Sequence, residues 1–149
     1  MMAGRNVLLM MGCPEVPVQT SIVLYLSNKL NKKGYNVMLA GTDAALKLLS
    51  VADPEGYYVK NTIDVDECIA DIVERKRDFD ICFAFMHNDA GVTYAATVSA
   101  ISQAKIYAVV FGKGSEALAD TIEFPAEKIV AKAVHNPIPL KAKLDRVEL

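Results

Sequence analysis

The sequence predicts a three-layer α/β/α sandwich with a mostly parallel sheet, in a Rossmann-like or flavodoxin-like strand order. Two observations predict this fold class. Four apolar runs are continuous rather than alternating, which is typical of strands buried on both faces of a sheet. They cover residues 6–11, 36–40, 80–86 and 105–111. Helical patterns lie between them, and this alternation favours parallel strands joined by right-handed crossovers.

The composition is that of an ordinary globular protein. The chain has 149 residues, 52% of them hydrophobic and 23% charged, so we expect a single α/β domain over residues 1–149. The net charge of −2 provides no positive field for nucleic acid or an anionic membrane, and no apolar stretch is long enough to span a bilayer. Cys13, Cys68 and Cys82 show no disulfide or zinc spacing, which fits a reducing cytoplasm. Cys68 and Cys82 lie in apolar surroundings and are expected in the core.

The first three predicted helices have recognisable ends. The first covers residues 18–33, where an apolar stripe recurs at spacings of three and four, and Gly34 ends it in a left-handed conformation. The second begins at Thr42 or Asp43, whose side-chain oxygen can accept from an amide of the first turn. The third begins at Asp64, which has capping-box spacing to an acidic residue three positions on.

The fourth predicted helix, residues 91–103, is rich in small side chains. Small side chains allow a helix to lie close to its own sheet or to a helix of a second subunit, and both alternatives remain open. Asp89 is expected to be the N-cap of this helix. A short further helix is expected after residues 112–115.

The C-terminal part is expected to contain one strand and one helix. Residues 121–124 are predicted as a fifth strand, and Pro125 is placed where a helix begins. That helix is expected to end near His135, which then acts as a cation at its C-terminus. The tail from Pro137 onward is predicted to be an edge strand or an arm laid on a partner subunit.

Polar and reactive side chains gather in the turns that follow the predicted strands. In open parallel sheets, ligands bind past the carboxyl ends of the strands, where the strand order reverses. The strand order second, first, third, fourth places that reversal between the first and third strands. These turns supply the candidate ligand-binding residues Gly12, Glu15, Thr42, Asp43, Asn88, Gly91, Gly112, Lys113, Gly114 and Ser115, and the candidate catalytic residues Cys13, His87 and Asp89.

Cys13 allows three interpretations. It precedes a helix N-terminus, which favours the thiolate, whereas Glu15 opposes it. The thiol is a small residue in a tight turn, a nucleophile oriented by His87 with Asp89 behind it, or a metal ligand together with those two residues, with or without Glu15. No spacing rule supports the last alternative, so no metal site is predicted, and the cofactor is left open.

The first turn is poorly suited to phosphate. Pro14 and Pro17 lack amide donors, and Glu15 repels an anion. The Walker pattern and the G-x-G-x-x-G pattern are both absent. The turn Gly112-Lys113-Gly114-Ser115 is the better anion-binding loop, because it combines a lysine with flexible backbone amides.

Two segments carry a resemblance to a known family. They are Gly12-Cys13-Pro14-Glu15-Val16-Pro17-Val18-Gln19-Thr20 and Gly41-Thr42-Asp43-Ala44-Ala45. Over nearly its whole length the chain resembles a family of small uncharacterised α/β proteins from methanogenic archaea. This resemblance implies a three-layer α/β/α domain in an archaeal cytoplasm and implies no activity. In the order of its elements the chain is also similar, more loosely, to the DsrE-type sulfur-transfer proteins, which are oligomers.

The leading hypothesis is a homo-oligomeric domain that holds a small-molecule ligand at the carboxyl edge of its sheet. The first alternative is a thiol-dependent enzyme or sulfur carrier that uses Cys13 with His87. The second is a structural subunit of a larger complex, in which the adjacent Tyr57 and Tyr58 form contacts.

Overall fold

Six parallel strands form one sheet in the order β3-β2-β1-β4-β5-β6. The structure is a computed structural model that describes residues 5–149, so the first four residues of the predicted domain lie outside it. The strands are β1 (Asn6–Met10), β2 (Asn36–Gly41), β3 (Thr62–Asp64), β4 (Ile81–Met86), β5 (Lys105–Val110) and β6 (Glu127–Val130). The four strands expected from the sequence are present in the expected order, and the order reverses between β1 and β4, as in Rossmann-like sheets. The predicted fold class is confirmed.

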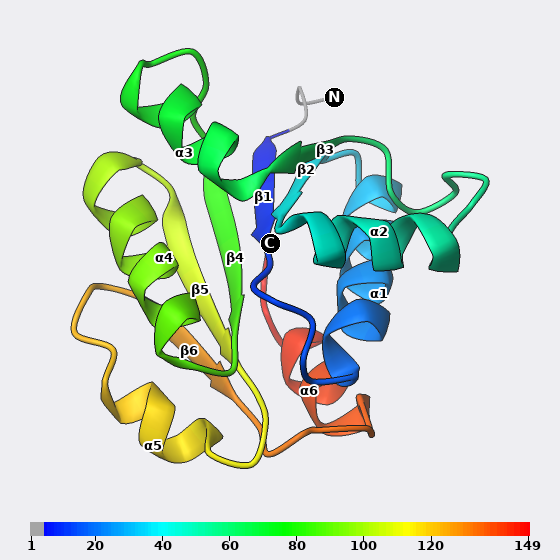
Figure 1. Ribbon diagram of the computed structural model, residues 1–149, viewed down its shortest axis with the longest axis vertical. Helices are drawn as coiled ribbons and strands as arrows, with labels where there is room; N and C mark the ends of the chain where they lie inside the picture. The colour runs from blue at the N-terminus through cyan, green and yellow to red at the C-terminus, as the bar shows by residue number, and fades with distance from the viewer. Residues whose placement is uncertain (1–4) are drawn as a thin grey trace.

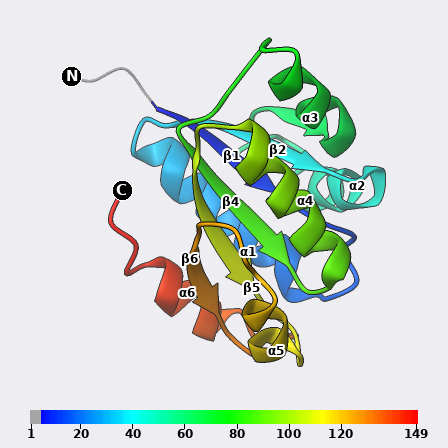
Figure 2. The ribbon, with the colours of Figure 1, turned by 90° about the vertical axis from the view of Figure 1, so that its left-hand side faces the viewer.

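Helices cover both faces of the sheet and make the three layers (Figures 1 and 2). They are α1 (Val18–Lys32), α2 (Asp43–Ala52), α3 (Val65–Val73), α4 (Asp89–Ile101), α5 (Ser115–Asp120) and α6 (Ile138–Leu144). One hydrophobic core packs α1, α2 and α6 on one face, and a second packs α3, α4 and α5 on the other. All six residues of β4 are buried, as expected for a central strand covered on both faces. Within residues 5–149, no helix is long and apolar enough to cross a membrane.

The helix ends follow the local sequence signals, with one correction. Thr42 caps α2 by accepting from an amide of its first turn, and Asp64 caps α3 by accepting from two amides. Gly34 follows α1 with a φ of +87°, the left-handed conformation that glycine adopts at helix ends. The prediction that Asp89 caps α4 is wrong. Asn88 is the N-cap, because its side-chain oxygen accepts from the amide of Gly91 at 3.1 Å, and Asp89 is the first residue of the helix.

The C-terminal part differs from the prediction. Residues 121–124 form a turn rather than a strand, and the segment after Pro125 forms the edge strand β6 instead of a helix. His135 therefore lies in the connection between β6 and α6 and ends no helix. The tail is neither an edge strand nor an extended arm: residues 138–144 form α6, which buries Leu140 and Leu144 against the core.

A polar cluster attaches α6 to α1. Asp145 accepts hydrogen bonds from the hydroxyl of Tyr25 at 2.5 Å and from Lys29 at 2.9 Å, both on α1. Lys141 on α6 donates to the same carboxylate at 2.9 Å. The Tyr25 hydroxyl and the two lysines hold the pKa of Asp145 well below its usual range. The last helix is thus joined to the first by charge-assisted hydrogen bonds.

A buried carboxylate organises the loop between α2 and β3. Asp53 is only 6% exposed and accepts three backbone hydrogen bonds, from Tyr57, Tyr58 and Val59, at 2.9–3.0 Å. Burial acts to raise the pKa of Asp53, but these three donors outweigh it and lower the pKa below its ordinary value. The loop is therefore held in one conformation while Tyr57 and Tyr58 point outward, 70% and 41% exposed.

The lowered pKa predicts how Asp53 contributes to stability as pH changes. A carboxyl group with a lower pKa in the folded state stabilises the fold above its unfolded-state pKa of about 3.9, and this contribution is lost as pH falls through the folded-state pKa. Asp53→Asn is expected to be less stable than the wild type at neutral pH, with the difference shrinking below about pH 4. Urea unfolding midpoints across this range measure the difference. A difference that stays constant or grows at low pH would contradict the assignment.

Candidate functional site

The turns that follow β1, β4 and β5 meet at the carboxyl edge of the sheet, where the strand order reverses. Nε2 of His87 lies 4.0 Å from Oε2 of Glu15. A methyl group placed on Gly112 would lie 3.6 Å from Cβ of His87 and 3.9 Å from Cγ2 of Val16. The structure therefore brings together three of the predicted residues, Glu15, His87 and Gly112, each from a different turn.

His87 is the enclosed member of this group. Its side chain is 8% exposed, whereas the Glu15 side chain is 64% exposed. The imidazole packs against the ring of Phe111, with 5.6 Å between ring centroids, and Nε2 lies 3.4 Å from Nδ2 of Asn88. The nearly enclosed imidazole thus lies beside an apolar ring, a carboxylate and a side-chain amide where the three turns meet.

Two buried polar groups beside these turns have unused hydrogen-bonding capacity. Gln19 on α1 is 1% exposed and donates through Nε2 to the carbonyl oxygen of Gly12 at 3.1 Å, but its Oε1 has no partner. Ser115 is fully buried and its amide donates to the carbonyl of Gly112, while its hydroxyl also has no partner. Buried polar atoms are nearly always paired, so each of these requires an explanation. Gln19 is hydrogen-bonded to the backbone of the turn after β1, and Ser115 to the backbone of the turn after β5.

The turn Gly112-Lys113-Gly114-Ser115 is less open to an anion than its composition suggests. The amide of Gly112 donates to the carbonyl of Ala133 at 2.8 Å, and the amide of Ser115 donates to Gly112 at 3.3 Å. Two of the four amides are thus already engaged. Gly112 has a φ of +93°, so the turn needs glycine at this position for its backbone conformation.

The remaining candidate residues have structural roles at helix ends. Thr42 is the N-cap of α2, and Asp43 forms an exposed ion pair with Lys47 at 2.8 Å. Gly91 lies in the first turn of α4, where an added Cβ would approach Cβ of Met86 to 2.7 Å. These roles explain the residue types at positions 42, 43 and 91 without a ligand.

The three interpretations of Cys13 remain separate hypotheses, and the geometry bears on the nucleophile and on the metal ligand. Among the described residues, no hydrogen bond joins His87 to Cys13 or to Asp89. Cys13 is exposed in the turn after β1. His87 contacts Glu15, Asn88 and Phe111, whereas Asp89 is exposed at the start of α4. Across the described residues, no three His, Cys, Asp or Glu side chains are grouped in a way that would hold a metal ion.

The three thiols are expected to differ sharply in reactivity. Burial raises the pKa of Cys68 to about 11 and raises the pKa of Cys82 further, whereas Cys13 is exposed. A thiol reagent such as 5,5′-dithiobis(2-nitrobenzoate) is therefore expected to label one thiol per native chain rapidly and all three after unfolding. Cys13→Ser should abolish the rapid phase. Rapid labelling of two thiols in the native protein, or a rapid phase that survives Cys13→Ser, would contradict this expectation.

Sequence reasoning did not select Gln19 or Phe111 as part of this region. A signal for Gln19 was present: a polar residue at a helix position between the buried Val18 and Ile22 faces the interior, where its amide needs partners. Phe111 belongs to a continuous apolar run, in which no local feature distinguishes it from an ordinary core residue.

The fold defines a class: a doubly wound, all-parallel α/β domain whose candidate site lies at the reversal of strand order. A family model described as "Domain of unknown function (DUF1890)" matches residues 8–147, and the chain belongs to this family. It is 38% identical over 148 residues to uncharacterized protein MJ0452 of Methanocaldococcus jannaschii, covering 95% of this chain and 96% of that protein. A solved structure titled "Structure of MT0777" is also 38% identical, with a TM-score of 0.88 and 95% of each chain covered. The predicted resemblance to a family with methanogen members is confirmed.

Proposed function

We propose that this protein is a homo-oligomeric domain that binds a small ligand in the crevice between the ends of β1 and β4. The observation that carries the proposal is the meeting of Glu15, His87 and Gly112 from three turns at the reversal of strand order. Ligands of open parallel sheets bind at this place because the connections after the two neighbouring strands run to opposite faces and leave a crevice. The net charge of −2 supports a small ligand in preference to a nucleic acid.

The chemistry of the crevice favours a ligand that donates hydrogen bonds. Glu15 supplies an exposed carboxylate, whose two oxygens accept hydrogen bonds. Pro14 and Pro17 remove two amide donors from the turn after β1, which weakens any phosphate site there. A small polar molecule with amine, amide or hydroxyl groups matches these acceptors better than a nucleotide does.

A thermal-shift screen of small polar molecules tests the proposal. A ligand present at about 100 times its Kd adds about 2.7 kcal/mol of stability, which raises Tm by roughly 5–10 °C in a chain of this size. The shift is expected in the wild type and is expected to be lost in Glu15→Gln and His87→Gln. Glu55→Gln, in the loop after α2, is the matched control and should retain it. A stabilising molecule that acts equally on all four proteins would place its site elsewhere and contradict the proposal.

Exposed apolar side chains support the self-association. Leu48 and Val51 on α2, with Tyr57 and Tyr58 in the loop that follows, are 44%, 78%, 70% and 41% exposed. A loop that is held rigid by Asp53 presents the two tyrosines at low entropic cost, which suits an interface. Val51→Glu is expected to shift the oligomer to a monomer in light scattering, whereas Val73→Glu, on α3 on the opposite face of the sheet, should not. An unchanged mass for Val51→Glu would exclude this surface.

The thiol-dependent alternative rests on one observation: Cys13 is exposed in the turn after β1, which also carries Glu15. Such an enzyme or sulfur carrier would use His87 to withdraw the thiol proton. His87→Gln is then expected to slow the alkylation of Cys13 at neutral pH by about tenfold or more. Alkylation at the wild-type rate would remove this alternative. Three free thiols support a reducing, cytoplasmic location.

A further inference from the structure

A hollow lies at the amino ends of the strands, opposite the turns of the proposed function. It has a volume of about 570 Å³, within the range of small-molecule sites. It lies between the C-terminal ends of α3 and α4, which are both near the top of Figure 1. The residues that line it are Ile72, Val73, Arg75, Arg77, Asp78 and Ile101.

Arg75 has a backbone conformation that arginine seldom adopts. Its φ is 60°, and within residues 5–149 it is the one non-glycine residue with a positive φ. The amide of Arg75 donates to Ile72 at 3.1 Å and that of Lys76 donates to Asp71 at 2.8 Å, which is the Schellman pattern that ends a helix. Glycine is the usual residue at this position. Arginine therefore occupies this position at a cost in backbone energy relative to glycine.

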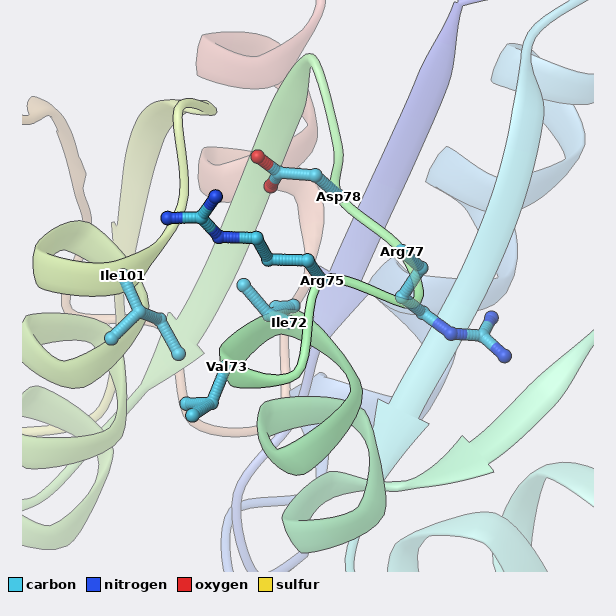
Figure 3. Close-up of a pocket in the computed structure, with 6 residues that line it drawn as sticks. All are labelled: Ile72, Val73, Arg75, Arg77, Asp78 and Ile101. Atoms are coloured by element: carbon cyan, nitrogen blue, oxygen red, sulfur yellow. The ribbon is translucent and has the colours of Figure 1, made fainter.

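Two of the three charged side chains that line the hollow already have hydrogen-bond partners within the protein. Asp78 accepts from the Ser102 hydroxyl at 2.5 Å and from two backbone amides, and Arg77 donates to Asp71 at 2.9 Å. The guanidinium of Arg75, by contrast, has no ion pair or hydrogen bond with any part of the chain that the structure describes. The hollow therefore presents one exposed cation without a partner in the described part of the chain, and the Asp78 carboxylate, which is already engaged, lies on the side of its guanidinium (Figure 3).

Apolar side chains form the rest of the surface beside that cation. Ile72, Val73 and Ile101 lie together along the Arg75 side chain, and Arg77 points away toward β2 (Figure 3). Ile72 is buried, but Val73 is 59% exposed, a high value for a valine. A free guanidinium beside an uncovered aliphatic surface is complementary to an anion that carries a hydrocarbon or aromatic group.

We propose that this hollow binds a small organic oxyanion. Its carboxylate or phosphate group meets the guanidinium of Arg75, and its apolar part covers Val73 and Ile101. The site is independent of the crevice between β1 and β4, because it lies at the other edge of the sheet and shares no residue with it.

Titration followed by amide chemical shifts in NMR spectra tests this site with defined probes. Phenyl phosphate carries both features, inorganic phosphate carries only the anion, and phenol carries only the apolar group. Phenyl phosphate is expected to give saturable shifts at residues 72–78 and 99–103, with an affinity about tenfold or more above that of either partial probe. Absence of saturation at millimolar phenyl phosphate, or shifts centred on Gly12 and His87, would overturn the proposal.

Substitutions at Arg75 separate binding from stability. Arg75→Gly is expected to weaken phenyl phosphate binding by about tenfold or more while raising Tm by about 2 °C, since glycine relieves the left-handed conformation. Arg75→Ala should lose the binding without the gain in Tm. Lys76→Ala is the matched control, because it removes a neighbouring charge outside the hollow, and it should bind nearly as well as the wild type. Unchanged binding by Arg75→Gly, or a fall in its Tm, would overturn the assignment of Arg75.

Discussion

Replacement of Phe83 by alanine is expected to lower the free energy of unfolding by about 3–5 kcal/mol, the largest effect of any single substitution considered. Phe83 lies in β4, the strand beside the reversal of strand order, and it is fully buried. Its ring stacks on that of Tyr107 in β5, with centroids 4.8 Å apart and planes 13° from parallel. Alanine removes this contact and leaves a cavity in the core that packs α1 against the sheet.

Urea unfolding followed by circular dichroism measures this loss. Since natural domains have a total stability of about 5–15 kcal/mol, the variant should be partly unfolded at moderate temperature. Phe83→Leu fills most of the volume and serves as the matched control, with an expected loss of about 1–1.5 kcal/mol. Equal losses for the two variants would mean that neighbouring side chains move into the space left by the ring. The expectation that Phe83→Ala leaves a cavity beside β4 would then be wrong.

Replacement of Gly91 by leucine is expected to destabilise the fold by about 3 kcal/mol, at the upper end of what overpacking usually costs. An added Cβ at this position would approach Cβ of Met86 to 2.7 Å and Cα of Met86 to 3.1 Å. The clash involves the backbone of β4, which a side-chain rotation cannot relieve. The first turn of α4 must therefore move away from the strand that ends at the crevice.

The two glycine positions Gly91 and Gly12 give a matched comparison. A Cβ added at Gly12 meets nothing within 4 Å, so Gly12→Ala should change the stability by less than about 0.5 kcal/mol. Gly91→Ala should be destabilising even though alanine is a better helix former than glycine. If Gly91→Ala were as stable as the wild type, the close approach of α4 to β4 would be contradicted.

The central part of the fold was predictable from the sequence because its signals are local and strong. The buried strands are continuous apolar runs, and Thr42 and Asp64 mark helix starts through side-chain caps. Once the four central strands are ordered, the turns after β1 and β4 must lie side by side. The meeting of the turns that carry Glu15 and His87 follows from that order alone.

The edge elements were not predictable in the same way. β3 is only three residues long, and β6 has one buried residue, Ile129, so neither shows the pattern of a central strand. Ile129 and Ala133 are four residues apart, the spacing of one face of a helix. In the structure Ile129 lies in β6 and Ala133 in the connection that follows, and both are buried by tertiary packing. α6 did carry a usable signal, since Pro137 and Pro139 stand at its beginning, where proline is tolerated.

The details of the crevice depend on packing that no single segment encodes. The enclosure of His87 by Phe111 arises from a contact between two elements that are separate in the chain. Asn88 and Asp89 are both good N-cap residues, and the choice between them is made by which side chain reaches the amide of Gly91.

A ligand at the carboxyl ends of β1 and β4 would be seen in a crystal structure of the protein, purified without chelator and soaked with the strongest stabilising molecule from the thermal-shift screen. We expect electron density between the carboxyl ends of β1 and β4, with the molecule hydrogen-bonded to the exposed carboxylate of Glu15 and lying beside the His87 ring. Density for that molecule at a different place, with the turns of Glu15 and His87 packed together and nothing between them, would rule out the proposed site.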